Sequence, residues 1–281
     1  MLPASIGWSK LPAAMALSIS LATVSATLRH LLAPDCVVCC IAAAEPPGSP
    51  VCAACRADYF PPGTPRCRLC ANRLPANLLP ANPPPGNRLP PGRPPPLRAH
   101  IPTATASGTD LCGRCLAHPP HFDATFALAD YAPPIDAMVA ALKFHNRLDL
   151  GRVFGLLMAE QAQPWRGDAI VPLPLAAPRL RERGYNQAEE IARVLAARLR
   201  RPLLCDALLR TRHCASQQSL RLAQRRTNVR GAFAAGPAVA GLHLLLVDDV
   251  LTSGSTLDAA AAALKRAGAR SVANCVIART P

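Results

Sequence analysis

Two groups of residues in this chain have types and spacings that could do chemistry. Near the C-terminus, Asp248 and Asp249 follow an apolar run and precede a turn rich in Thr, Ser and Gly, in the sequence LLLVDDVLTSGST. The pattern predicts a buried strand that ends in two carboxylates, then a turn that opens a helix. Backbone N–H groups at a helix N-terminus bind phosphate, and paired acids at the carboxyl end of a strand suit ribose hydroxyls. The segment therefore predicts a sugar-phosphate site.

The turn after the two aspartates supplies the phosphate ligands in this interpretation. Gly254 allows the backbone to approach a phosphate closely. The hydroxyls that can add donors belong to Thr252, Ser253, Ser255 and Thr256. The segment is not a Walker A loop, because the sequence GxxxxGK[ST] is absent. The alternative, an ordinary capped strand–turn–helix, leaves two costly carboxylates at a buried strand end without a purpose.

The second group is a set of four CxxC pairs. They are Cys36 and Cys39, Cys52 and Cys55, Cys67 and Cys70, and Cys112 and Cys115. Two thiolates separated by two residues can point from one tight turn, here called a knuckle, at one metal ion. Two knuckles complete a tetrahedral shell of four sulfurs. The sequence therefore predicts two structural zinc sites. It leaves open whether the first pair joins the second and the third the fourth, or whether the pairs interleave. A secreted disulfide framework is the rival interpretation, but CxxC doublets favour zinc.

Composition limits the class of protein. The chain has 281 residues, a formal net charge of +14, and 50% hydrophobic but only 4% aromatic residues. This hydrophobic content excludes a wholly disordered chain. Past the first thirty positions, no uncharged apolar run of about 18 residues predicts a membrane span. The apolar stretch 11–28 allows a weak signal peptide, but we favour an N-terminal extension over 1–27 and a cytoplasmic protein.

Proline and the pattern of hydrophobic residues divide the rest of the chain. Residues 28–120 contain the cysteine pairs, interrupted by a Pro-rich stretch at 71–111 that predicts a disordered insert. A proline-rich ligand for a partner domain is the alternative for this stretch. Strands are predicted at 122–131, 168–175, 203–209, 242–250 and 272–278, and helices at 134–144, 148–161, 185–199 and 256–267. This alternation predicts a parallel α/β sheet in residues 121–281.

Several motifs together resemble a known family. VDDVLTSGST resembles the phosphoribosyl-pyrophosphate motif of type I phosphoribosyltransferases. The segments ALKF (141–144), VPLP (171–174), RLRERGYNQ (179–187), SQQSL (216–220) and RRTNVRGAF (225–233) resemble the ComF competence family, as does the Cys-rich module introduced by LRHLLAP (28–34). The resemblance covers about residues 28–279 apart from the Pro-rich insert. The chain departs from the family at Cys40 and Ala71, where glycine is usual after a knuckle.

The resemblance implies a type I phosphoribosyltransferase parallel sheet behind an N-terminal zinc-ribbon module. It implies that Asp248 and Asp249 contact ribose hydroxyls and that Thr252, Ser253, Gly254, Ser255 and Thr256 hold the 5′-phosphate. The pyrophosphate loop would lie at Val171, Pro172, Leu173 and Pro174, with Mg²⁺ on the diphosphate. A flexible loop at 179–187 would close over the site and bring Arg181 and Arg183 to it. Lys143 is a further candidate catalytic residue.

Three functions fit these features. The first is a phosphoribosyltransferase whose acceptor no motif identifies. The second is a binding module that keeps the phosphoribosyl site and serves import of transforming single-stranded DNA. The third is a zinc-dependent adaptor for other competence proteins, such as a DNA-uptake helicase. Residues 179–230 hold thirteen Arg and four acidic residues, which suits either a polyanionic substrate or DNA. Only Tyr185 within this segment and Phe233 just after it are available to stack on bases.

Overall fold

The computed structural model describes residues 36–41, 49–75, 110–211 and 231–281. It divides the chain into two compact units, Met1–Cys55 and Arg56–Pro281. The predicted N-terminal extension 1–27 and positions 76–109 of the predicted Pro-rich insert lie outside the described residues. Within the part that is described, no helix has the length and apolar character needed to cross a bilayer.

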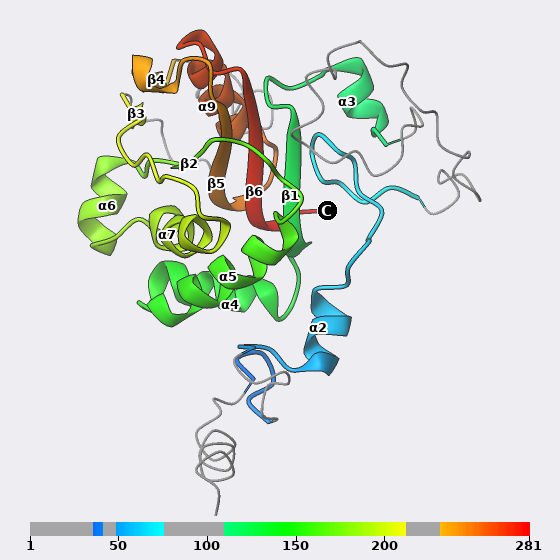
Figure 1. The fold of residues 1–281 in the computed structure, drawn as a ribbon. Coiled ribbons are helices and arrows are strands. Elements are labelled where there is room, and N and C mark those ends of the chain that lie inside the picture. The colour runs from blue at the N-terminus through cyan, green and yellow to red at the C-terminus, as the bar shows by residue number, and fades with distance from the viewer. Residues whose placement is uncertain (1–35, 42–48, 76–109, 212–230) are drawn as a thin grey trace, which may run out of the picture. The chain divides into compact units, whose positions relative to one another are not determined.

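The second unit is built on a four-stranded parallel sheet. Its strands are β1 (Ala124–Asp130), β2 (Ala169–Pro172), β5 (His243–Leu251) and β6 (Ser271–Arg279), in the order β1-β6-β5-β2 (Figure 1). The pairs β1–β6, β5–β6 and β2–β5 are all parallel, which confirms the predicted sheet. The carboxyl ends of parallel strands meet at one edge, and Asp248 and Asp249 lie near that end of β5.

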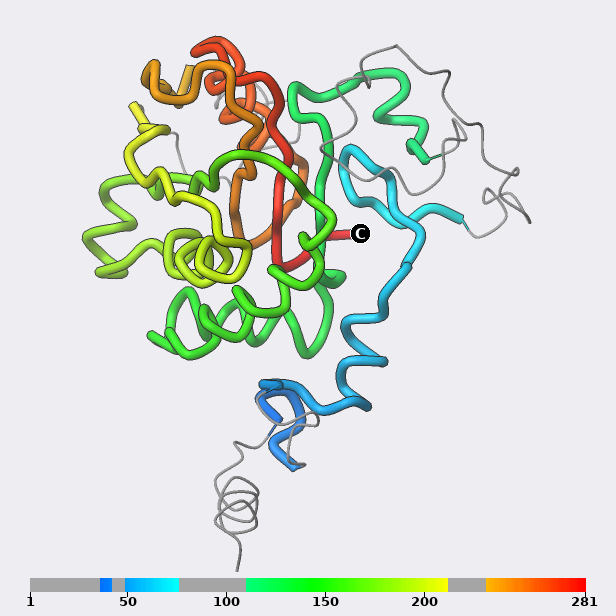
Figure 2. The backbone as a smooth tube through the Cα atoms, in the orientation of Figure 1, coloured from blue at the N-terminus to red at the C-terminus, as the bar shows by residue number. Residues whose placement is uncertain are grey.

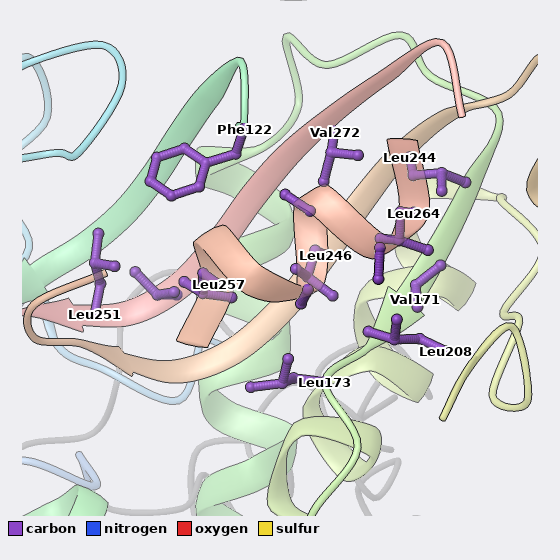
Figure 3. Close-up of a cluster of buried hydrophobic side chains, with 14 of the residues drawn as sticks. Phe122, Val171, Leu173, Leu208, Leu244, Leu246, Leu251, Leu257, Leu264 and Val272 are labelled. Atoms are coloured by element: carbon purple, nitrogen blue, oxygen red, sulfur yellow. The ribbon is translucent and has the colours of Figure 1, made fainter. Parts of the chain in front are cut away.

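Helices cover both faces of this sheet. Those that pack on it are α5 (Leu148–Gln161), α7 (Gln187–Leu199) and α9 (Ser255–Arg266), while α4 (Ile135–Phe144) packs on α5 and α6 (Ala177–Arg183) has no buried residue. Helices α5 and α7 pack on each other and on the sheet, whereas α9 packs on β5 and β6 together with a second, two-stranded sheet. Figure 3 shows Leu257 and Leu264 of α9 beside Leu244 and Leu246 of β5 in the buried cluster. Burial on both faces explains why residues 244–247 of β5 and 275–278 of β6 are continuous apolar runs.

The segment around 177–210 differs in detail from its prediction. In place of the expected flexible loop at 179–187, the structure has most of helix α6, a connection of three residues at 184–186 and the first residue of α7. Pro178 in the first turn of α6 suits helix initiation, and Gly184 ends the helix with a left-handed φ of +81°. The strand predicted at 203–209 forms only as β3 (Leu208–Arg210), which pairs antiparallel with β4 (Phe233–Ala235).

The cysteine-containing part of the second unit packs along β1 (Figure 2). Thr125 of β1 donates its hydroxyl to Leu69 O, and its N–H donates to Arg68 O at 2.9 Å. The first residues of the predicted Pro-rich insert belong to this arrangement. Cys67 N donates to Asn72 O at 2.7 Å, and Leu74 N donates to Pro65 O at 2.9 Å.

Candidate functional site

The turn between β5 and α9 has the geometry expected of a phosphate-binding loop. Gly254 takes a left-handed φ of +82° and stands immediately before α9. A Cβ placed there would lie 3.5 Å from Leu251 Cδ1, and the φ alone would strain any other residue. The Gly254 carbonyl accepts the first helical bond, from Asp258 N at 2.8 Å. The hydroxyls of Ser253 and Ser255 lie 2.9 Å apart, next to the N–H groups of the first helical turn.

A cavity of about 660 Å³ opens over this turn and the end of β5. The predicted site residues that line it are Lys143, Leu173, Pro174, Arg183, Asp248, Asp249, Thr252, Ser253, Gly254, Ser255 and Thr256. Val171 and Pro172 do not line it, because they belong to β2 and pair with Leu246 and Val247 in the buried sheet. Arg181 is not part of the wall either; Arg179, two residues earlier on α6, takes that place.

The two aspartates have different surroundings. Asp249 is only 5% exposed, and both of its carboxylate oxygens are engaged. Lys143 Nζ lies 2.7 Å from Oδ1, and Gln187 Nε2 donates to Oδ2 at 2.6 Å. Asp248 Oδ1 accepts from the backbone N–H of Asp249 at 2.8 Å. Burial and the neighbouring charge of Asp249 raise the pKa of Asp248 to about 8.

Gln187 joins the acid pair to the basic helix α6. Its Oε1 accepts a hydrogen bond from Arg183 Nη1, while its Nε2 donates to Asp249 Oδ2. The Arg183 guanidinium also lies over the ring of Phe144, 5.3 Å from its centroid. Arg183 is therefore held in the cavity wall by an amide and a ring, where its positive charge favours an anionic ligand.

Sequence reasoning missed two residues of this site. Gln187 ends the RGYNQ motif, so the motif marked it, but nothing in the sequence paired it with Asp249. Arg210 is one of many arginines in its segment and carried no signal of its own. The structure places Arg210 in the cavity wall, over the ring of Phe233 at 5.4 Å, and none of the described residues accepts a hydrogen bond from its buried Nε. Its charge partly opposes the upward shift of the pKa of Asp248.

The eight knuckle cysteines form two tetrads, which settles their pairing. Cys36, Cys39, Cys52 and Cys55 make the first tetrad, and Cys67, Cys70, Cys112 and Cys115 the second. Within each, the four sulfurs lie within 4.8 Å of one another. Zn–S bonds of about 2.3 Å in a tetrahedron place sulfurs about 3.8 Å apart. The distances of 3.9 Å between the sulfurs of Cys39 and Cys52, and 3.6 Å between those of Cys70 and Cys112, fit this geometry.

The residues that follow two knuckles show why glycine is usual there. Cys40 and Ala71 adopt left-handed φ values of 57° and 55°. Each donates its N–H four residues back, Cys40 to Cys36 O at 2.8 Å and Ala71 to Cys67 O at 2.7 Å. The chain keeps the knuckle turn in both places despite the Cβ, at a cost of about 1 kcal/mol per residue.

One thiol of the second tetrad is favoured as a thiolate, whereas hydrogen bonding to Cys67 raises the pKa of Cys70 and burial raises that of Cys115. Hydrogen bonding from the Cys70 thiol is the main reason that the pKa of Cys67 falls to about 4, and backbone N–H groups add to this effect. A thiolate is the form of cysteine that binds metal. Cys275 contrasts with it, since burial in β6 raises its pKa to about 12 and leaves it an inert thiol.

Comparisons with known proteins agree with the fold. A family model described as a phosphoribosyl transferase domain matches residues 182–281. DNA utilization protein YhgH of Escherichia coli O157:H7 is 36% identical over 176 residues, which cover 60% of this chain and 78% of that protein. Competence protein F of Haemophilus influenzae is 30% identical over 57% of this chain and 75% of its own length. Competence protein ComFC of Streptococcus pneumoniae is 25% identical over 52% of this chain and 64% of its own.

Among solved structures, a glutamine phosphoribosylpyrophosphate amidotransferase from B. subtilis, complexed with ADP and GMP, aligns with a TM-score of 0.32 and 19% identity. The alignment covers 45% of this chain and 25% of that one. The fold assignment rests on the family model and on the parallel sheet, and the cysteine tetrads add the metal-binding module.

Proposed function

The chain belongs to the ComF competence family, and on that premise we propose that it binds phosphoribosyl pyrophosphate with Mg²⁺ and acts in the import of transforming single-stranded DNA. One observation carries the ligand proposal. Asp248, Asp249 and the turn from Thr252 to Thr256 line a single cavity at the carboxyl end of a parallel sheet. That cavity brings acceptors for ribose hydroxyls and donors for a 5′-phosphate to one place.

In this proposal, different residues bind different parts of the ligand. The N–H groups and hydroxyls of 252–256 hold the 5′-phosphate, and Asp248 accepts from a ribose hydroxyl. Asp249, which Lys143 and Gln187 already hold in place, accepts from the second ribose hydroxyl. Arg179 and Arg183 face the diphosphate from α6, and Mg²⁺ neutralises part of the diphosphate charge. Lys143 is thus a positioning residue that acts through Asp249.

Turnover would displace pyrophosphate from C1 of the ribose. The C1–oxygen bond to pyrophosphate breaks with its electron pair leaving on pyrophosphate, and an acceptor nucleophile forms a bond to C1. Arginines that stabilise the leaving charge and exclude water lower such a barrier. Arg210 supports this proposal, because it lines the cavity and its buried Nε has no hydrogen-bond partner among the described residues, so that it can donate to an anionic group of the ligands.

A binding module without turnover is the second candidate. The observation that favours it is the state of Asp249, whose two oxygens are both engaged by side chains of the chain itself. In such a protein the phosphoribosyl site would control binding of DNA or of another competence protein, such as a DNA-uptake helicase. The names of the relatives, which refer to competence and to DNA utilization, support a role in DNA uptake. We place the protein in the cytoplasm, where metal-binding thiols stay reduced.

Titration calorimetry with phosphoribosyl pyrophosphate, with and without Mg²⁺, tests the ligand proposal. A pyrophosphate-release assay over amine, purine and pyrimidine acceptors then separates the two candidates. Release with one acceptor establishes the transferase. Tight Mg²⁺-dependent binding without release with any acceptor supports the binding module, and no binding at all contradicts both.

A further inference from the structure

Arg279 connects the second cysteine tetrad to the phosphate-binding turn. It is the last residue of β6, pairs with Leu251 of β5 and is only 8% exposed. Its Nε donates to Cys70 O at 2.9 Å. Its Nη1 donates to Thr252 O at 2.8 Å and to Leu251 O at 3.1 Å. A single guanidinium therefore holds a carbonyl of the metal-binding knuckle, the last carbonyl of β5 and the first carbonyl of the turn.

Arg114 makes a second connection of the same kind. It lies on α3 (Gly113–Ala117), the short helix that carries Cys115. Its Nη2 donates to Ser253 O at 2.9 Å. Three consecutive carbonyls, at positions 251, 252 and 253, are thus held by two arginines. Arg279 also contacts the carbonyl of Cys70, and Arg114 lies on the helix that carries Cys115.

These hydrogen bonds hold the carbonyl groups of the turn, which face away from the proposed ligand. A turn that points its N–H groups at a phosphate presents its carbonyls elsewhere, and buried carbonyls need donors. A buried guanidinium is itself costly unless its N–H groups are paired, so Arg279 and the carbonyls stabilise one another. Donors that are fixed before the ligand arrives improve binding, because less ordering remains to be done.

We propose that Arg279 is a positioning residue that makes the phosphate-binding turn depend on the metal-bound state of the second tetrad. When the knuckle at Cys70 loses its metal, its carbonyl moves and the turn loses its fixed position. The first tetrad has no such role, because its four cysteines lie in Met1–Cys55 and none of the hydrogen bonds described above involves them. The inference rests on the proposed function only where it concerns phosphoribosyl pyrophosphate; the ordering of the turn is independent of it.

The experiment measures hydrogen exchange of residues 252–256 in the full-length, ligand-free protein, together with zinc content and binding of phosphoribosyl pyrophosphate. Two matched pairs of variants are compared. Cys67→Ser with Cys70→Ser removes the second tetrad, and Cys36→Ser with Cys39→Ser removes the first. Arg279→Lys keeps the charge but loses the forked geometry of the guanidinium. Arg66→Lys is its control, since Arg66 also holds a knuckle carbonyl, that of Ala71 at 3.1 Å, but does not contact the turn.

We expect exchange at 252–256 to rise about tenfold in the second-tetrad variant and in Arg279→Lys, with a similar decrease in ligand affinity. The first-tetrad variant and Arg66→Lys should stay within about twofold of the wild type. Zinc content should remain normal in Arg279→Lys, which shows that the effect lies downstream of the metal.

Equal exchange in Arg279→Lys and the wild type would overturn the proposal, as would equal effects of the two tetrads. If the second-tetrad variant fails to fold, the two arginine variants decide. If the wild type does not bind phosphoribosyl pyrophosphate but the exchange pattern is as expected, the positioning role of Arg279 stands and the proposed function falls.

Discussion

Lys143 on α4 and Asp249 on β5 form an ion pair in which Nζ lies 2.7 Å from Oδ1. The carboxylate side chain is 7% exposed and the lysine side chain 21%, so the pair is largely removed from water. The pair gives Lys143 a role that its position in the sequence did not reveal. It compensates a buried charge and fixes the rotamer of an acid at the edge of the cavity.

The first prediction follows from this pair. Lys143→Met should lower the free energy of unfolding by about 2–3 kcal/mol, because it leaves the Asp249 charge buried without a partner. Lys143→Met combined with Asp249→Asn should be less destabilised than Lys143→Met alone. Urea unfolding at pH 7 measures both. Strictly additive changes would show that the two side chains do not interact.

The second prediction concerns the pH dependence of Asp248. Its pKa of about 8 in the folded protein lies above the ordinary value of 3.8, so the unfolded chain binds fewer protons between these values. The group therefore costs stability increasingly as the pH rises from about 4 to about 8. Asp248→Asn should therefore stabilise the ligand-free protein at pH 7, because it removes a group whose ionised form the folded state disfavours.

Thermal unfolding of Asp248→Asn and of the wild type across this pH range tests whether the stability gained by the substitution increases with pH. The gain should disappear below about pH 4, where Asp248 is protonated in both states. A constant difference between pH 4 and pH 8 would contradict the assignment of a raised pKa.

The third prediction separates the ends of the Pro-rich insert from its middle. Replacing residues 77–108 with a short Gly–Ser linker should leave two zinc ions per chain. This replacement keeps two residues that anchor the ends of the insert. Asn72 O accepts a hydrogen bond from Cys67 N, and the carboxylate of Asp110 lies 3.0 Å from Arg68 Nε. A deletion that begins at Asn72 should reduce zinc to one ion per chain, because it removes the turn around the third knuckle. Elemental analysis decides, and equal zinc in both deletions would contradict the anchoring role.

The fourth prediction addresses DNA. Arg225→Ala with Arg226→Ala, in a segment outside the described residues, should weaken binding of single-stranded DNA equally for all sequences. It should also reduce the log–log salt slope by about 0.7 for each phosphate that is no longer neutralised. Fluorescence anisotropy at several salt concentrations measures both. If the wild-type protein has no affinity for single-stranded DNA at low salt, the DNA hypothesis is wrong. The positive charge would then attract the phosphoribosyl ligand or a protein partner.

The sequence predicted most of what its local patterns encode. The strand that carries Asp248 and Asp249, the helix after Gly254 and the parallel sheet are confirmed, because strand and helix periods are local properties. The pairing of the knuckles was left open, since four equivalent CxxC pairs allow several combinations until chain geometry selects one.

Contacts between distant segments could not be predicted. The bond from Gln187 to Asp249 and that from Arg279 to Cys70 join residues whose proximity depends on how α7, β5 and β6 pack. The same limit applies to Val171 and Pro172, which the structure places in β2 and not in the cavity wall. A motif locates a loop to within a few residues, but only the register of β2 on β5 shows which of its residues leave the sheet.

Titration calorimetry of phosphoribosyl pyrophosphate with Mg²⁺ on the wild type and on Asp248→Asn combined with Asp249→Asn tests the central claim most directly. The wild type should bind one ligand per chain, and the double variant should lose this binding while its circular dichroism spectrum stays native. Both substitutions remove acceptors that ribose hydroxyls need and leave Lys143 and Gln187 in place. Equal affinity of the two proteins would contradict the assignment of the paired carboxylates to a phosphoribosyl site.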